Sequence, residues 1–138
     1  MNYQKRVLNW LTACFSMEIC RDVTERNHRF LEEALELVQS TGCTASEAHQ
    51  LVDYVFGRPP GEPFQEIGGV KVTLSALCSS IDQDEDLAAE AELTRISAPA
   101  VMEKIRARQA AKPKHSPLPE RTARPASSPP AQQKNATT

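Results

Sequence analysis

Apolar residues recur at intervals of three and four along most of this chain, and that spacing constrains the fold more than any other feature. On an α-helix such a spacing places the apolar side chains on one face. The pattern predicts helices over five regions, at about 4–21, 25–40, 44–56, 64–81 and 85–109. No segment sustains the alternation of apolar and polar residues that a half-buried strand requires. The sequence therefore predicts an all-α fold, a bundle of four or five helices.

Short motifs predict where several of these helices begin and end. The sequence TASE, from Thr44 to Glu47, is a capping box, in which each side chain accepts a hydrogen bond from the other residue's backbone N–H. Gly42 closes the preceding helix, because glycine suits the residue that follows a helix end. Pro99 has no backbone N–H to donate, so it should kink or divide the last helical region near Ser97.

The character of the chain changes at Lys112. The segment 112–138 holds 6 of the 10 prolines and no aromatic residue. It carries 5 Lys+Arg against 1 Asp+Glu, whereas residues 1–111 carry 11 Lys+Arg against 17 Asp+Glu. A segment of this composition cannot bury enough apolar surface to offset the entropy lost on ordering. We therefore predict a helical domain over 1–111 and a basic, disordered tail over 112–138.

Composition also narrows the class of protein. The formal net charge of -2 argues against a dedicated nucleic-acid binder, since such proteins need a basic surface. The 4 cysteines form no CxxC pair and no cluster at zinc-ligand spacing, which indicates a reducing, cytoplasmic compartment. No hydrophobic run is long enough to span a bilayer. The N-terminus starts basic and turns apolar, but it carries Glu18 and lacks a small-residue cleavage site, so we do not expect a signal peptide. We expect no membrane partner and no specific nucleic-acid partner.

Three glutamates stand out within five positions of the second predicted helix: Glu32, Glu33 and Glu36. At about 100° per residue, Glu32 and Glu36 lie about 40° apart and Glu33 and Glu36 about 60° apart. Neighbouring carboxylates destabilise a helix unless something compensates their repulsion. Mg²⁺ could do so, because it prefers hard oxygen ligands. The alternative is an acidic helix face that is simply solvated.

One turn of helix seldom completes a Mg²⁺ site, so a second helix should contribute. The candidate is EIGGVKVTLSAL, from Glu66 to Leu77. Gly68 and Gly69 lie inside this predicted helix, where each costs about 1 kcal/mol relative to alanine. They could let a ligand or another backbone come close, or they could serve close helix packing with no ligand.

The sequence EEALE at 32–36, followed by EIGGVKVTLSAL at 66–77, resembles the MazG-like, all-α nucleotide pyrophosphohydrolases. That superfamily has an EExxE helix and, further along, a helix with ExxD. The order ERNHRFLEEALELVQ, FGRPPGEP and EIGGV is similar to a small bacterial and phage branch of it. The resemblance covers roughly 10–119. The chain departs from the pattern at Gly69, which stands where the superfamily has the aspartate.

The resemblance implies an enzyme that cleaves nucleoside triphosphates between the α- and β-phosphates, giving a monophosphate and pyrophosphate. It implies Mg²⁺ or Mn²⁺ as the cofactor, with Glu33, Glu36 and Glu66 as metal ligands. Glu32 would orient the attacking water as a base, or would bind the metal. Two cations near these glutamates, Arg29 and Lys71, would bind phosphate. The metal ligand missing at Gly69 could be replaced by water or by one of three other carboxylates: Asp53, Glu62 and Glu92.

The superfamily is usually dimeric or tetrameric, with sites near subunit interfaces, so the resemblance also implies a homo-oligomer. The first predicted helix, rich in large apolar residues, is a candidate interface. Trp10 is interpreted as a core or interface residue and His28 as a surface histidine.

Two alternatives to the enzyme stay open. One is a non-catalytic MazG-like module that binds a nucleotide or a protein, and the other is a plain helical scaffold with an accidental EExxE.

Overall fold

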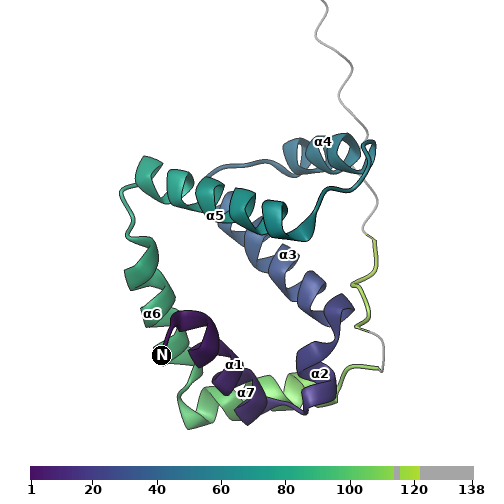
Figure 1. The fold of residues 1–138 in the computed structure, drawn as a ribbon. Helices are drawn as coiled ribbons and strands as arrows, with labels where there is room; N and C mark the ends of the chain where they lie inside the picture. Colours follow the sequence, from purple (N-terminus) through teal and green to yellow (C-terminus); the bar gives the residue numbers. More distant parts are fainter. Residues whose placement is uncertain (114–115, 122–138) are drawn as a thin grey trace, which may run out of the picture.

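The structure, a computed structural model, describes residues 1–113 and 116–121, and its regular elements in these ranges are all helices (Figure 1). In chain order they are α1 (Tyr3–Cys14), α2 (Met17–Arg21), α3 (Val23–Ser40), α4 (Ala45–Phe56), α5 (Pro63–Ser80), α6 (Glu85–Ile96) and α7 (Pro99–Ala110). The predicted all-α class is confirmed. The predicted number of four or five helices is wrong, because the described residues form seven. None of these helices is long and apolar enough to cross a membrane.

The extra helices arise where capping side chains interrupt the apolar pattern. Ser16 has an extended backbone, and its hydroxyl accepts from the Ile19 N–H, so the predicted first helix ends and α2 begins. Asp22 caps α3 in the same way and accepts from two N–H groups of its first turn. Apolar spacing continues across both breaks, which is why periodicity alone does not reveal them. The predicted division before Pro99 is confirmed, with proline in the first turn of α7.

The capping box predicted at the start of α4 is confirmed. The Glu47 N–H donates to the Thr44 hydroxyl at 3.2 Å, and the Thr44 N–H donates to Glu47 Oε1 at 3.0 Å. Two backbone donors that the helix leaves without an internal partner are thereby satisfied.

Thr44→Ala should therefore lower the free energy of unfolding by about 1 kcal/mol. Urea unfolding followed by circular dichroism measures the change. Thr12→Ala is a matched control, because the Thr12 hydroxyl only bonds back to carbonyls of its own helix. An equal loss of stability in both variants would contradict the assignment of the stabilisation to the cap.

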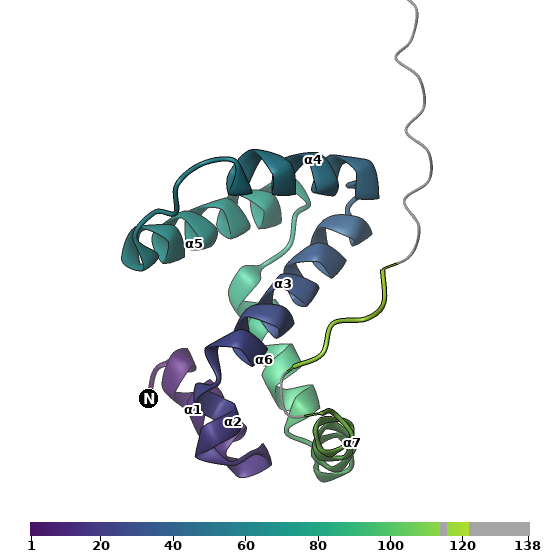
Figure 2. The same cartoon turned by 90° about the vertical axis from the view of Figure 1, so that its right-hand side faces the viewer.

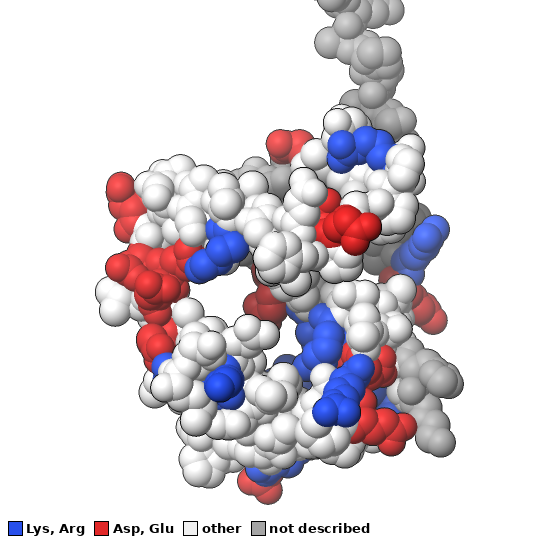
Figure 3. Space-filling view, viewed as in Figure 1, with Lys and Arg blue, Asp and Glu red and all other residues white. Residues whose placement is uncertain are grey.

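The helices are arranged as an open frame. The views from two directions show α1, α2 and α7 together at one end and α4 and α5 at the other, joined by α3 and α6 (Figures 1 and 2). The helix pairs in closest contact are α1 with α2, α1 with α7, α2 with α3, and α6 with α7. The space-filling view shows an opening through the middle of the molecule (Figure 3). A single chain therefore does not form the closed bundle that was predicted.

Aromatic and polar side chains link α1 to α6 near the end of the frame that holds α7. The Trp10 indole donates to the Ile96 carbonyl at 2.9 Å, and its ring meets Phe15 edge to face at 6.2 Å between centroids. The Arg6 guanidinium forms a bidentate pair with Glu90 on α6. Trp10 is half-buried here and packs as predicted. Within the described ranges, only three apolar residues are buried, and each keeps a small exposed fraction: Cys14, Cys20 and Leu93.

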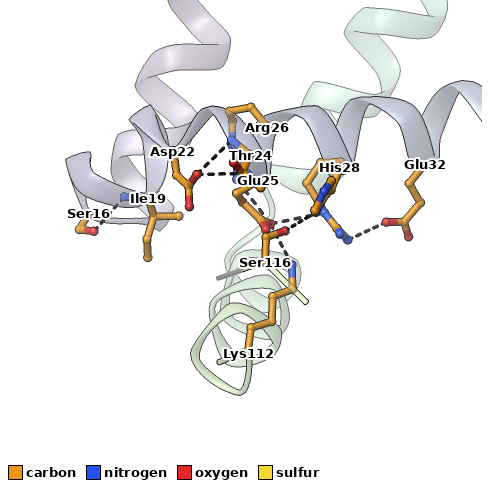
Figure 4. A network of polar contacts seen from close by, with 11 residues as sticks. Ser16, Ile19, Asp22, Thr24, Glu25, Arg26, His28, Glu32, Lys112 and Ser116 are labelled. Carbon is orange, nitrogen blue, oxygen red and sulfur yellow. Dashed lines mark hydrogen bonds and ion pairs between the residues drawn. The ribbon is translucent and has the colours of Figure 1, made fainter. Parts of the chain in front are cut away.

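The segment after α7 contacts α3 (Figure 4). The Lys112 ammonium donates to Glu25 Oε1 at 2.9 Å, and the Ser116 hydroxyl lies 2.8 Å from His28 Nδ1. The first residues of the predicted tail are thus held against the helical domain. The rest of that prediction, at 114–115 and 122–138, lies outside the described residues.

Candidate functional site

A cavity of about 550 Å³ lies between the first half of α3, the end of α6 and α7. Its apolar wall consists of Trp10, Phe15, Ile96, Val101 and Ile105. Four carboxylates line it: Glu25, Glu32, Glu33 and Glu92. Five cationic side chains line it as well: Arg26, Arg29, Arg95, Arg108 and Lys112. A pocket with an apolar wall and charged groups of both signs suits a ligand that carries a ring, a polyanion and a bound cation.

Glu33 is the carboxylate whose titration is most affected by its acidic neighbours. Partial burial raises the pKa of Glu33, and the charges of Glu36, Glu92 and Glu32 raise it further. The Arg95 guanidinium opposes this rise only in part. Negative charge is therefore concentrated around Glu33, and a cation bound there would relieve the repulsion.

Arginines already pair with three of the cavity's four carboxylates: Glu25, Glu32 and Glu92. Arg29 Nη1 lies 2.6 Å from Glu32 Oε2. Arg95 binds Glu92 with two hydrogen bonds, of 2.6 and 2.9 Å, and these hold the pKa of Glu92 below its ordinary value. Glu92 is thus ionised beside Glu33. Because guanidinium groups also match phosphate in geometry, the same arginines could exchange a carboxylate for a phosphate group.

Glu25 is the buried carboxylate of the cavity lining, and it is only 2% exposed. Besides Lys112, its Oε1 faces Arg29 Nε at 3.4 Å and Arg26 Nη2 at 3.7 Å. Burial alone would raise the pKa of Glu25, but the Ser116 hydroxyl and the charges of Lys112 and Arg29 outweigh it, so the pKa lies below its ordinary value. Glu25 therefore acts as a buried anchor that positions cations at the cavity.

The predicted site residues on α3 lie at or beside this cavity. Glu32, Glu33 and Arg29 line it. Glu36 is exposed one turn further along α3, and its charge acts on Glu33. Of the three proposed substitutes for the missing aspartate, Glu92 lines the cavity, whereas Asp53 and Glu62 do not.

The predicted site residues on α5 lie elsewhere. Glu66 is exposed in the first turn of α5 and does not line the cavity. Lys71 forms an ion pair with Glu85 at the start of α6. In Figure 2 the beginning of α5 points away from α3. One chain therefore does not bring the EExxE glutamates and Glu66 together.

Sequence reasoning missed Glu25, Arg95, Arg108 and Lys112. A local signal existed for Glu25, which precedes Arg29 by four residues and so shares its helix face. The others come to the cavity only through the tertiary arrangement, because α6, α7 and the residues after α7 line the same cavity as α3.

The donor atoms suit a hard cation, since carboxylate oxygens are the ligands that Mg²⁺ prefers. The positions of these carboxylates in a single chain do not match what Mg²⁺ requires. Over 1–113 and 116–121, no three Asp, Glu, His or Cys side chains lie close enough together to hold a metal ion. The carboxylates that line the cavity are therefore not grouped as metal ligands within these ranges.

Comparisons with protein-family models, curated proteins and solved structures give no match. The fold and the cavity define an all-helical chain with a mixed-charge pocket.

Proposed function

We infer that this chain is a Mg²⁺-dependent nucleoside triphosphate pyrophosphohydrolase, which cleaves the α–β phosphoanhydride bond. The observation that carries the proposal is the cavity beside α3, where Glu32 and Glu33 meet arginines and an apolar wall. The resemblance of the EExxE and EIGGV segments to MazG-like enzymes supports it independently.

A nucleoside triphosphate needs positive charge along its phosphates and an apolar contact for its base. Arg29, Arg95 and Arg108 would supply the first, and Trp10 and Phe15 the second. When bound, Mg²⁺ would neutralise phosphate charge and polarise water. Glu33 and Glu36 are the residues of α3 that would hold it.

The reaction adds one water across the bond between the α- and β-phosphates. The water oxygen joins the phosphorus on one side of the bridging oxygen, the P–O bond on that side breaks, and the nucleoside monophosphate and pyrophosphate separate. Glu32 would accept the proton of that water, after Arg29 turns from the carboxylate to a phosphate oxygen. The walls of the cavity would limit the access of competing water.

The direct test measures pyrophosphate released from a panel of nucleoside triphosphates with Mg²⁺ or Mn²⁺. We expect nucleoside monophosphate and pyrophosphate in equal amounts, and no release when the metal is chelated. Nucleoside diphosphate and inorganic phosphate would instead indicate cleavage at the β–γ bond. No metal-dependent product from any triphosphate would overturn the proposal.

Activity and Mn²⁺ affinity should rise with pH through the elevated pKa of Glu33. A protonated carboxyl must lose its proton before it binds a metal, so the rise begins at a higher pH than for an ordinary glutamate. Glu92→Gln should move the Glu33 titration to lower pH, because it removes a neighbouring negative charge and frees Arg95. Carbon-13 NMR of the side-chain carboxyls measures the titration directly. An unchanged Glu33 pKa in Glu92→Gln would contradict the assigned coupling.

The second candidate is a non-catalytic nucleotide-binding or interaction module. Gly69 and the exposed position of Glu66 favour it, since both leave the metal site incomplete within one chain. It predicts that triphosphates bind, as calorimetry would detect, and are recovered intact.

A further inference from the structure

Charge is unevenly distributed along the stretch of α3 that lines the cavity. Near the start of α3, Lys112, Arg26 and Arg29 all face Glu25 through one of its oxygens, Oε1. Glu33 lies eight positions later, about 12 Å further along the helix axis. Three carboxylates and one guanidinium act on the charge of Glu33. The cavity therefore has a cationic end, formed by Lys112, Arg26 and Arg29, and an acidic end around Glu33.

At the cationic end, one carboxylate oxygen faces more donors than it can satisfy. The Nε–H groups of Arg26 and Arg29 are buried and form no hydrogen bond within the described ranges. Glu25 Oε1, which both arginines face, already accepts from Lys112 at 2.9 Å (Figure 4). A buried donor without an acceptor costs free energy. A ligand rich in oxygen atoms would supply acceptors that Glu25 does not.

The three cations of this end are also open to a ligand. All of them line the cavity, and their side chains are 24% (Lys112), 30% (Arg26) and 36% (Arg29) exposed. The Lys112 ammonium has three N–H donors, of which Glu25 takes one within the described ranges. Lys112 can therefore bind a second acceptor without leaving Glu25, and the buried carboxylate keeps its counter-charge.

We propose that the cationic end is a binding subsite for a pyrophosphate group, and that Lys112 is a ligand-binding residue supplied by the segment after α7. A nucleoside triphosphate then lies with its β- and γ-phosphates at this end and its α-phosphate toward Glu32 and Glu33. That orientation rests on the proposed function, and the pyrophosphate subsite does not.

A pyrophosphate group suits this arrangement better than a single phosphate does. Guanidinium groups bind phosphate through two parallel hydrogen bonds, whereas an ammonium acts as a point charge. Arg26 and Arg29 stand about one turn apart on α3, and Lys112 approaches from a different segment. Oxygens on two phosphorus atoms can meet all three cations at once. The subsite should therefore bind free pyrophosphate as well as the same group within a nucleotide.

The subsite is tested by titrating inorganic pyrophosphate into the full chain, with metal chelated, in a calorimeter. We expect binding to the wild type that weakens as salt is added. Lys112→Gln should weaken it by roughly 10-fold or more, because a charge-assisted hydrogen bond is lost. Lys104→Gln, at an exposed position of α7 outside the cavity lining, should bind as the wild type does. No binding to the wild type, or equal loss in both variants, would overturn the subsite.

Carbon-13 NMR of the wild type tests the Lys112 contact independently of how a variant folds. The Cε signal of Lys112, assigned by its absence from Lys112→Arg, should shift as pyrophosphate is added. Binding that leaves this signal unmoved would overturn the role of Lys112. Inorganic phosphate at equal ionic strength should bind about 10-fold more weakly, since it presents fewer oxygens to the three cations. Equal affinity for the two anions would overturn the assignment to a pyrophosphate group.

Nucleoside triphosphates test the orientation. Lys112→Gln should weaken triphosphate binding by the same factor as pyrophosphate binding, and saturating pyrophosphate should compete with the triphosphate. Triphosphate binding that neither change affects would overturn the orientation and leave the pyrophosphate subsite standing. A protein that binds pyrophosphate through Lys112 and cleaves no triphosphate would overturn the proposed function, and the subsite would again stand.

Discussion

Glu33→Gln and Glu36→Gln are each expected to lower metal-dependent pyrophosphate release by roughly 100-fold or more. Each change removes a charged oxygen ligand where negative charge is concentrated, while the amide keeps nearly the same shape. Because repulsion around Glu33 is also relieved, the metal-free variants should be at least as stable as the wild type. Initial rates at saturating Mg²⁺ measure the first effect, and urea unfolding measures the second.

The matched control is Glu103→Gln, on the exposed surface of α7 away from the lining of the cavity. It changes net charge by the same amount and should leave the rate unaltered. Mg²⁺ should raise the melting temperature of the wild type and of this control, and not that of Glu33→Gln. Full activity in both Glu33→Gln and Glu36→Gln would show that these glutamates are not needed for the reaction.

Glu25→Gln is expected to lower the free energy of unfolding by about 1–3 kcal/mol. The variant leaves Lys112, Arg26 and Arg29 without the buried carboxylate that they share. In a domain of this size the melting temperature should fall by several degrees for each kcal/mol. Glu90→Gln breaks an exposed pair with Arg6 and should cost less than about 1 kcal/mol. Equal losses in the two variants would contradict the role of Glu25 as a buried anchor.

The ion pairs of Glu25 should also make the free energy of unfolding depend on pH in the acidic range. The folded-state pKa of Glu25 lies below the value of about 4.3 expected in the unfolded chain. The stabilisation is therefore complete above that pH and is lost as pH falls through the lowered pKa. The difference in unfolding free energy between wild type and Glu25→Gln should shrink over this window. A difference that does not change down to pH 2 would show that burial, and not charge, stabilises this position.

The sequence predicted features that depend on neighbours along the chain. The capping box at Thr44, the end of α3 near Gly42 and the break at Pro99 follow from local hydrogen bonding and backbone geometry. The separation of α1 from α2 was missed, although Ser16 is a good capping residue. The helical spacing of apolar residues continues across Ser16, and a single capping residue is weak evidence for a break in such a pattern.

The candidate site could be predicted only on the helix that carries most of it. Glu32, Glu33 and Glu36 share a face of α3 because helix geometry requires it. Sequence alone did not distinguish Glu92 from Asp53 and Glu62, and only the structure shows that Glu92 lines the same cavity as the residues of α3. Glu25 was overlooked because its burial depends on Lys112, which is 87 residues away along the chain.

By itself, the sequence determined the helical class, most helix ends and the charged face of α3, because these depend on contacts within a few residues. Only the tertiary structure decided that α6 and α7 bring arginines and Glu92 to that face, and that α5 keeps Glu66 away from it. Contacts between distant segments depend on how whole helices pack, and the spacing of apolar residues records which face is buried but not against which partner.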